Sequence, residues 1–287
     1  AFSFVKKNEH ANAIKQLENY LLQYPDGYFV VNANYYLAYS ANAEGRKDLA
    51  LEHYEAVNDM SPNEFVEKAL KGAAIIFYSN TNYEKALMRF RQLEEIAVIR
   101  ENVLLSALGQ MRCHYKLLEF QQCIDMADKV LNLAYASIDH KIEAHYYSGK
   151  SNLELSQLDK AMASFTQVYS NNSGNIGAES KYLTAYIFYL KEDYDEALNT
   201  VLALKDDFSN NDYYVAKGFI LLADVFVKMG DFFQAKSTLQ SIIDNFPDEG
   251  INKLASNKLA EIIRLEKSLE QTNPDEDENE IEIDSDN

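Results

Sequence analysis

The sequence predicts an all-α protein built from repeated pairs of helices. Its 287 residues are 47% apolar and 25% charged, the balance of an ordinary folded protein. Ten glycines and four prolines are few for the many turns of a β-sandwich or barrel. A sequence pattern also recurs about every 37 residues along the chain, a period typical of stacked helical hairpins.

The recurring pattern is a bulky residue, two polar residues and an alanine, as in Tyr83–Ala86 and Tyr194–Ala197. Apolar side chains follow four and seven residues after this alanine, for example Phe90 and Leu93. Offsets of zero, four and seven lie on one face of an α-helix. Taken as anchors, the alanine and its equivalents are Ala13, Ala50, Ala86, Cys123, Ala161, Ala197 and Ala235.

A second helix precedes each anchor. The residue twelve positions before the anchor is small in six of seven units, as at Ala38 and Ala74, and this lets two helices pack closely. Proline stands twelve positions after the anchor at Pro25, Pro62 and Pro247, where it ends the second helix. Each unit is therefore a helix, a turn, a helix and a loop, and units bury their apolar faces by stacking.

These columns resemble the tetratricopeptide repeat over about residues 1–250. The resemblance implies a right-handed α–α superhelix of about seven helix-turn-helix units. The units run two to four residues longer than the family's usual period, so we expect longer loops between them. The fourth unit has Met111, Cys123 and Ala127 in its signature columns, and we expect an irregularity of packing or pitch there.

The two ends differ from the repeats. Ala1 stands in the small-residue column, so we expect a truncated first helix at Ala1–Lys6, a parent chain that continues upstream, and self-association through the exposed apolar end. Residues 251–271 form the predicted capping helix, and residues 272–287, with eight acids and no base, form a predicted acidic disordered tail. The apolar residues of the predicted cap include Leu254, Leu259, Ile262, Ile263 and Leu265.

The formal net charge of −18 argues against nucleic acid and against an anionic membrane surface as partners. The apolar runs, such as Ala73–Tyr78, are too short to span a bilayer, so we expect no direct membrane insertion of this segment.

Enzyme signatures are absent from the sequence, and we expect neither catalysis nor a cofactor. Adjacent Cys113 and His114 point about 100° apart on a helix, which does not suit a nucleophile and its base. Cys123 fits a small buried hydrophobe, and we expect no disulfide between the two cysteines. His140 and His145 lie off one helical face, so we expect no metal site there.

The remaining candidate site is a concave groove lined by the first helices, a surface that the family resemblance implies. Its columns, at offsets of −18, −15, −11 and −8 from the anchors of the six complete units, hold eight tyrosines where about two are expected by chance. They also hold five bases and three acids: Lys68, Lys71, Arg112, Lys150 and Lys217 against Glu143, Glu179 and Asp224. The tyrosines are Tyr35, Tyr39, Tyr78, Tyr115, Tyr146, Tyr182, Tyr186 and Tyr189.

Two interpretations of these tyrosines stay open: filling between neighbouring helices, or contact with a partner. The predicted function is a scaffold that binds a protein segment, best an acidic one, with Lys68, Lys71, Arg112 and Lys150 attracting its carboxylates. The alternatives are a structural or oligomerisation module of a larger envelope protein and, more remotely, a carbohydrate-binding groove.

The long units and the endings Tyr24-Pro25-Asp26 and Phe246-Pro247-Asp248 also resemble bacterial cell-envelope tetratricopeptide proteins of the outer-membrane-assembly and Tol-coordinating families. That resemblance implies a periplasmic location, with the cytoplasm as the alternative.

Overall fold

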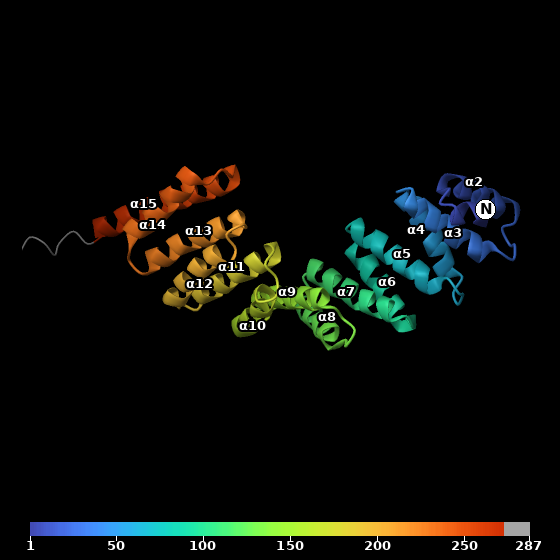
Figure 1. Ribbon diagram of the computed structural model, residues 1–287, viewed down its shortest axis with the longest axis horizontal. Coiled ribbons are helices and arrows are strands. Elements are labelled where there is room, and N and C mark those ends of the chain that lie inside the picture. Colours follow the sequence, from blue (N-terminus) through green and yellow to red (C-terminus); the bar gives the residue numbers. More distant parts are fainter. Residues whose placement is uncertain (273–287) are drawn as a thin grey trace, which may run out of the picture. The chain divides into compact units, whose positions relative to one another are not determined.

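The structure, a computed structural model, describes residues 1–272. This part of the chain contains fifteen α-helices and no strand. It divides into two compact units, residues 1–161 and residues from Met162 onward, and the boundary falls inside helix α10 (Leu158–Tyr169). In each unit, helices that follow one another in the sequence pack side by side (Figure 1).

The first unit is a stack of helical hairpins. Each first helix of a repeat packs on its own second helix, which packs in turn on the first helix of the next repeat. The helices are α1 (Phe2–Lys6), α2 (His10–Gln23), α3 (Val30–Ala43), α4 (Lys47–Asp59), α5 (Val66–Ser79), α6 (Tyr83–Ile96), α7 (Arg100–Lys116), α8 (Phe120–Asn132) and α9 (Ile138–Glu154).

The second unit repeats this arrangement and ends in a longer helix that packs on both α13 and α14. Its helices after α10 are α11 (Asn175–Leu190), α12 (Tyr194–Asp207), α13 (Asp212–Lys228), α14 (Phe232–Asn245) and α15 (Glu249–Thr272). Within the described residues, both units are therefore α-solenoids.

The core follows the predicted columns. All seven anchors are 0% exposed, including Cys123. All seven side chains four residues later are buried, from Leu17 at 6% to Phe165 at 0%. An anchor this small leaves room for the facing first helix, and the larger side chain one turn later fills the space between repeats.

A left-handed residue lies in the turn inside each hairpin, always five residues before the anchor. The next amide donates to the carbonyl five residues back at 2.8 to 3.0 Å, as from Glu119 to His114, which is the Schellman ending of a helix. Glycine is the residue that enters this region without strain, yet only two of the seven are glycines. The seven are Asn8, Gly45, Thr81, Leu118, Ser156, Glu192 and Gly230.

The extra length of the repeats is divided between connections and first helices. Six residues join α2 to α3 and α4 to α5, whereas three residues join α6 to α7, and α7, α9 and α13 each have 17 residues. The fourth hairpin packs against both neighbours within the first unit, but a different side chain fills its contact with the next repeat. Tyr147 packs on the cluster that contains Cys123 and Ala127, so it supplies the bulk that Ala127 lacks.

The last helix begins at Glu249, two residues before the predicted start, and it buries only part of the predicted apolar set, with Leu259 half-buried against the core of the second unit. Ile251, Ala255 and Ile262 are buried, while Leu254 is 52% exposed. Ile263 and Leu265, also predicted to pack, are exposed as well. The reason is helical geometry, because positions four and eleven residues after Ile251 share its face of the helix, toward α13 and α14. The predicted tail lies outside the described residues, except for Thr272.

Both cysteines are free and buried, in agreement with the sequence analysis. Burial raises the pKa of the Cys113 thiol to about 12 and that of Cys123 to about 11. Within residues 1–272, no helix has the length and apolarity needed to span a bilayer.

Candidate protein-binding surface

The predicted groove residues lie on the first helices of both units, and their rings are accessible. Of the eight tyrosines, Tyr39 is 43% exposed and the other seven are half-buried. Each ring therefore packs partly against its neighbours and presents its remaining surface to solvent. The tyrosines therefore fill space between neighbouring helices, and part of each ring remains exposed.

In the first unit, α3 and the start of α5 form one aromatic group. The ring of Tyr35 stacks on Phe65 with centroids 4.6 Å apart. Lys68 places its Nζ 5.9 Å from the Tyr35 centroid and 6.0 Å from that of Phe65. Phe65 belongs to this aromatic group, and sequence reasoning missed it because it precedes the first helix, outside the columns considered.

A second group joins α7 to α9. Tyr115 contacts Tyr147 with centroids 5.2 Å apart, and Tyr146 contacts Tyr147 at 5.6 Å. Lys150 Nζ lies 5.6 Å from the Tyr115 centroid and 5.1 Å from that of Tyr146, and it donates to the Tyr146 hydroxyl at 3.2 Å. Tyr147, one residue from a predicted column, was also missed.

Arg112 behaves differently from the prediction. Its Nε and Nη2 donate to the two carboxylate oxygens of Glu143 at 2.5 and 2.7 Å. This bidentate pair links α7 to α9 and balances the guanidinium charge, so Arg112 is not available to attract acids. Tyr78, beside this pair, contacts Tyr83, and burial raises its pKa.

In the second unit, Lys217 of α13 lies over Tyr182 of α11, with Nζ 4.8 Å from the ring centroid, and 5.7 Å from that of Tyr213. Tyr186 and Tyr189 stack at 6.4 Å along α11. Burial raises the pKa of Tyr182 to about 12. Its hydroxyl, like that of any tyrosine at neutral pH, can donate a hydrogen bond.

One arrangement thus occurs three times. A tyrosine on one first helix lies beneath a lysine on the next, and the lysine stands three positions closer to the start of its repeat: Tyr35 with Lys68, Tyr115 with Lys150, and Tyr182 with Lys217. A lysine ammonium within about 6 Å of a ring centroid is attracted by the ring face. The tyrosine ring therefore restricts the position of the ammonium group, which the long lysine side chain would otherwise leave mobile.

The acids of this surface are already engaged. Glu143 pairs with Arg112, Asp224 pairs with Lys258 at 3.1 Å, and Glu179 accepts from the Tyr214 hydroxyl at 2.9 Å. In contrast, Lys68, Lys71 and Lys217 have no carboxylate within ion-pair distance in residues 1–272. The surplus charge on these surfaces is therefore positive.

Family models match both ends of the chain. A tetratricopeptide repeat model matches residues 3–65 and a tetratricopeptide repeat-like domain matches residues 191–274. The chain belongs to the tetratricopeptide repeat proteins. Together the two matches cover about half of its length, and no curated protein sequence is significantly similar to the whole.

Solved structures share this fold at low sequence identity. The C-terminal part of a tetratricopeptide repeat-containing protein from Cytophaga hutchinsonii is 13% identical, with a TM-score of 0.63, and the alignment covers 88% of this chain and 96% of that one. A tetratricopeptide repeat protein from Parabacteroides merdae is 14% identical, with a TM-score of 0.51 and coverage of 90% and 95%.

A further relative is YrrB, described as a tetratricopeptide repeat protein with an unusual peptide-binding site. It is 17% identical, with a TM-score of 0.53 and coverage of 72% and 100%. Similarity at this level concerns the fold, and membership of the family supports a scaffold for protein interactions.

Proposed function

We propose that this tetratricopeptide repeat protein is a non-catalytic scaffold that binds an acidic segment of another protein along its first helices. The observation that carries the proposal is the tyrosine–lysine pair that occurs three times. In two of these pairs the lysine, Lys68 or Lys217, has no carboxylate within ion-pair distance in the described chain.

The chemistry of the pair fits a carboxylate. The ammonium group faces a ring on one side and offers its remaining N–H bonds to an incoming acid, which gives a charge-assisted hydrogen bond. The half-buried tyrosine adds flat contact area at a low cost in conformational entropy. The hydroxyl of Tyr182 adds a hydrogen-bond donor.

The thiols also support a binding role over catalysis. A cysteine nucleophile needs a lowered pKa and solvent access. Cys113 and Cys123 are each 0% exposed, and burial raises both pKa values. Neither thiol suits attack on a substrate.

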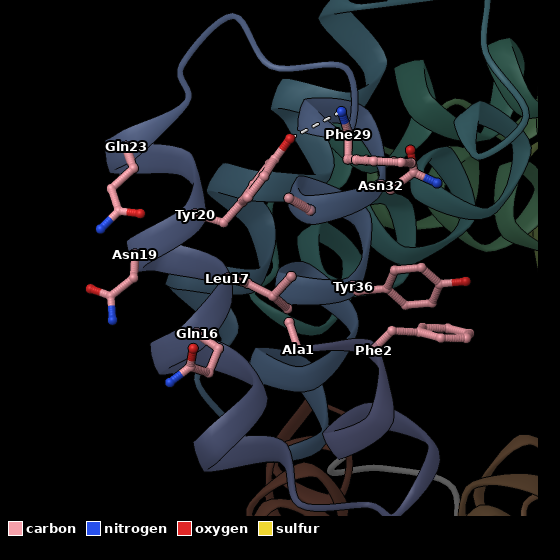
Figure 2. A pocket seen from close by; sticks show the side chains of 11 residues that line it. Ala1, Phe2, Gln16, Leu17, Asn19, Tyr20, Gln23, Phe29, Asn32 and Tyr36 are labelled. Atoms are coloured by element: carbon pink, nitrogen blue, oxygen red, sulfur yellow. Dashed lines mark hydrogen bonds between the residues drawn. The ribbon is translucent and has the colours of Figure 1, made fainter.

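A second candidate function, self-association, is favoured by a groove at α1–α3 (Figure 2) lined by apolar and neutral polar side chains, whose Tyr36 contacts Tyr35.

The test is a titration of the full chain with a fluorescent peptide that alternates glutamate and leucine. A counterpart with lysine in place of glutamate serves as the comparison. We expect binding of the acidic peptide only, and weaker binding as the salt concentration rises from about 50 to about 300 mM, since salt screens exposed charges.

Lys68→Ala and Lys217→Ala should each weaken this binding about fivefold, which corresponds to about 1 kcal/mol. Lys253→Ala, an exposed lysine of α15, is the matched control and should change nothing. Equal binding of the two peptides would contradict the proposal, as would an equal effect of all three substitutions.

A further inference from the structure

Two neighbouring connections of the first unit carry exposed apolar side chains. They join α6 to α7 at residues 97–99 and α8 to α9 at residues 133–137. Val98 is 86% exposed, and Ile138, the first residue of α9, is 60% exposed. We call the whole set the connection patch, and its members are Ile96, Val98, Ile99, Tyr135 and Ile138, each at least 39% exposed.

The repeat columns show that apolar side chains are unusual at this place. Twelve positions after the anchor, the other repeats have proline or serine, whereas the third and fourth have Val98 and Tyr135. The exposed residues of the equivalent connection at residues 170–174 are serine, asparagine and glycine. Such residues suffice to form a turn, so the hairpins themselves do not require apolar residues there. The column contains Pro25, Pro62, Val98, Tyr135, Ser173, Ser209 and Pro247.

The two connections lie beside each other. The Arg100 guanidinium at the start of α7 lies over the Tyr135 ring, 5.8 Å from its centroid. Just before the connections, Lys129 of α8 donates to Glu94 of α6. Each of these contacts joins residues 35 positions apart and brings the two connections to one edge of the stacked hairpins. The five apolar side chains therefore form one surface.

Hydrogen bonds hold the backbone on both sides of the patch. The Ala97 amide donates to the last turn of α6 at 2.8 Å, and the Asn102 amide donates to the Ile99 carbonyl at 2.9 Å. In the second connection, Ser137 and His140 form a capping box at the start of α9. The patch is thus ordered before a partner arrives, which lowers the entropic cost of binding.

The charged side chains that border the patch have both signs. They are Arg100, Glu95, Glu101 and Asp139, and none of them has an opposite charge within ion-pair distance in residues 1–272. Arg100 and Glu101 are adjacent in the sequence. A surface with an unpaired base beside an unpaired acid is complementary to itself, because a two-fold axis places the base of each copy opposite an acid of the other.

We propose that the connection patch binds the same patch of a second copy across a two-fold axis, with Val98 close to the axis. Burial of apolar surface drives the contact. A patch of a few hundred Å² on each copy is smaller than the roughly 800 Å² per partner of a stable complex, so the dimer is weak. Both patches are used in the contact, so association stops at the dimer.

The first test is sedimentation of the full chain over about 5 to 500 µM, the range suited to a small interface. We expect monomers at the lowest concentration and an approach to the dimer mass, with no larger species, at the highest. Association should tighten about twofold as salt rises from about 50 to about 300 mM, because each copy has a net charge of −18 and acids outnumber bases around the patch.

Substitutions locate the contact. Val98→Asp and Ile138→Asp each place a charge inside the patch and should weaken association at least about tenfold, or about 1.4 kcal/mol. Met88→Asp makes the same change at an exposed methionine of α6 outside the patch, and this control should associate like the unaltered chain. Circular dichroism verifies that every variant is folded.

A cysteine near the axis gives an independent measurement. The two native thiols are 0% exposed, so an introduced surface cysteine is the accessible one. With copper–phenanthroline as the oxidant, Val98→Cys should form a disulfide-linked dimer faster than Met88→Cys at the same concentration. A reducing agent should release the monomer.

A chain that stays monomeric at all concentrations overturns the proposal, as do equal rates of cross-linking at the two positions. Association that Val98→Asp leaves unchanged also overturns it and would assign the contact to another surface, such as the α1–α3 groove. Each of these results leaves the proposed acidic-peptide binding standing. That binding weakens with salt and depends on Lys68 and Lys217, and Val98→Asp should not change it.

Discussion

A seam is the contact between the second helix of one repeat and the first helix of the next. The seams after the third and the fourth hairpin are equivalent, but the large side chain comes from the second helix in one and from the following first helix in the other. In the third, Phe90 of α6 packs against Gly109 of α7, where an added Cβ would lie 2.5 Å from the ring. In the fourth, the column of Phe90 holds Ala127, and Tyr147, in the column of Gly109, packs on the Ala127 cluster. The repeat therefore keeps the filled volume of the seam and not the residue at either position.

The largest expected effect on stability comes from removing the Phe90 ring, which fills the seam after the third hairpin. Phe90→Ala should lower the free energy of unfolding by about 3 to 5 kcal/mol, because Phe90 is 3% exposed and Gly109 offers no side chain to fill the cavity. Urea denaturation followed by circular dichroism measures this loss. A loss below about 1 kcal/mol would mean that the seam collapses around the alanine.

A double substitution tests the comparison directly. Gly109→Tyr alone should destabilise the protein, since its ring would overlap Phe90. Phe90→Ala combined with Gly109→Tyr reproduces the fourth seam and should be more stable than Phe90→Ala alone. If the changes in the free energy of unfolding caused by the two substitutions simply add, the side chains at positions 90 and 109 do not fill the same space.

A smaller effect is expected in the turn of the fourth hairpin. Leu118, in the fourth, has φ of 60° and is 71% exposed. Leu118→Gly should raise the free energy of unfolding by about 1 kcal/mol, because glycine relieves the left-handed strain at little loss of packing. The control is Leu155→Gly, where φ is −83°: it should destabilise, and a gain there would show that strain is not the cause.

The smallest effect concerns two histidines that border these hairpins. Burial lowers the pKa of His53, although Glu52 and Glu18 act to raise it, and burial also lowers the pKa of His145. The unfolded chain, with a histidine pKa near 6.5, binds protons more readily than the folded one. Stability is therefore complete above about pH 6.5 and falls as the pH drops below it.

We expect a loss of less than about 1 kcal/mol between pH 7.5 and 5.5, since both side chains are half-buried. The urea midpoint of unfolding measures it. A variant with His53→Gln and His145→Gln should show a shallower dependence, and an unchanged slope would assign the effect to other groups.

Several features of this protein could be predicted from the sequence because a helix imposes its period on the chain. The anchors, the residues four positions later and the proline endings predict the hairpins, and their burial follows directly. Burial of Cys123 was predicted from the same columns, because it stands at an anchor position that a small apolar side chain fills.

The tertiary structure alone decided which side chains meet across repeats. Lys68 lies over Tyr35, and Arg112 is neutralised by Glu143, through contacts between residues more than 30 positions apart. It also decided that Leu265 is exposed and that Phe65 is covered where Phe29 is not. The physical reason is that a helical period fixes the face on which a side chain lies, whereas its neighbour depends on the register and length of the adjoining helix.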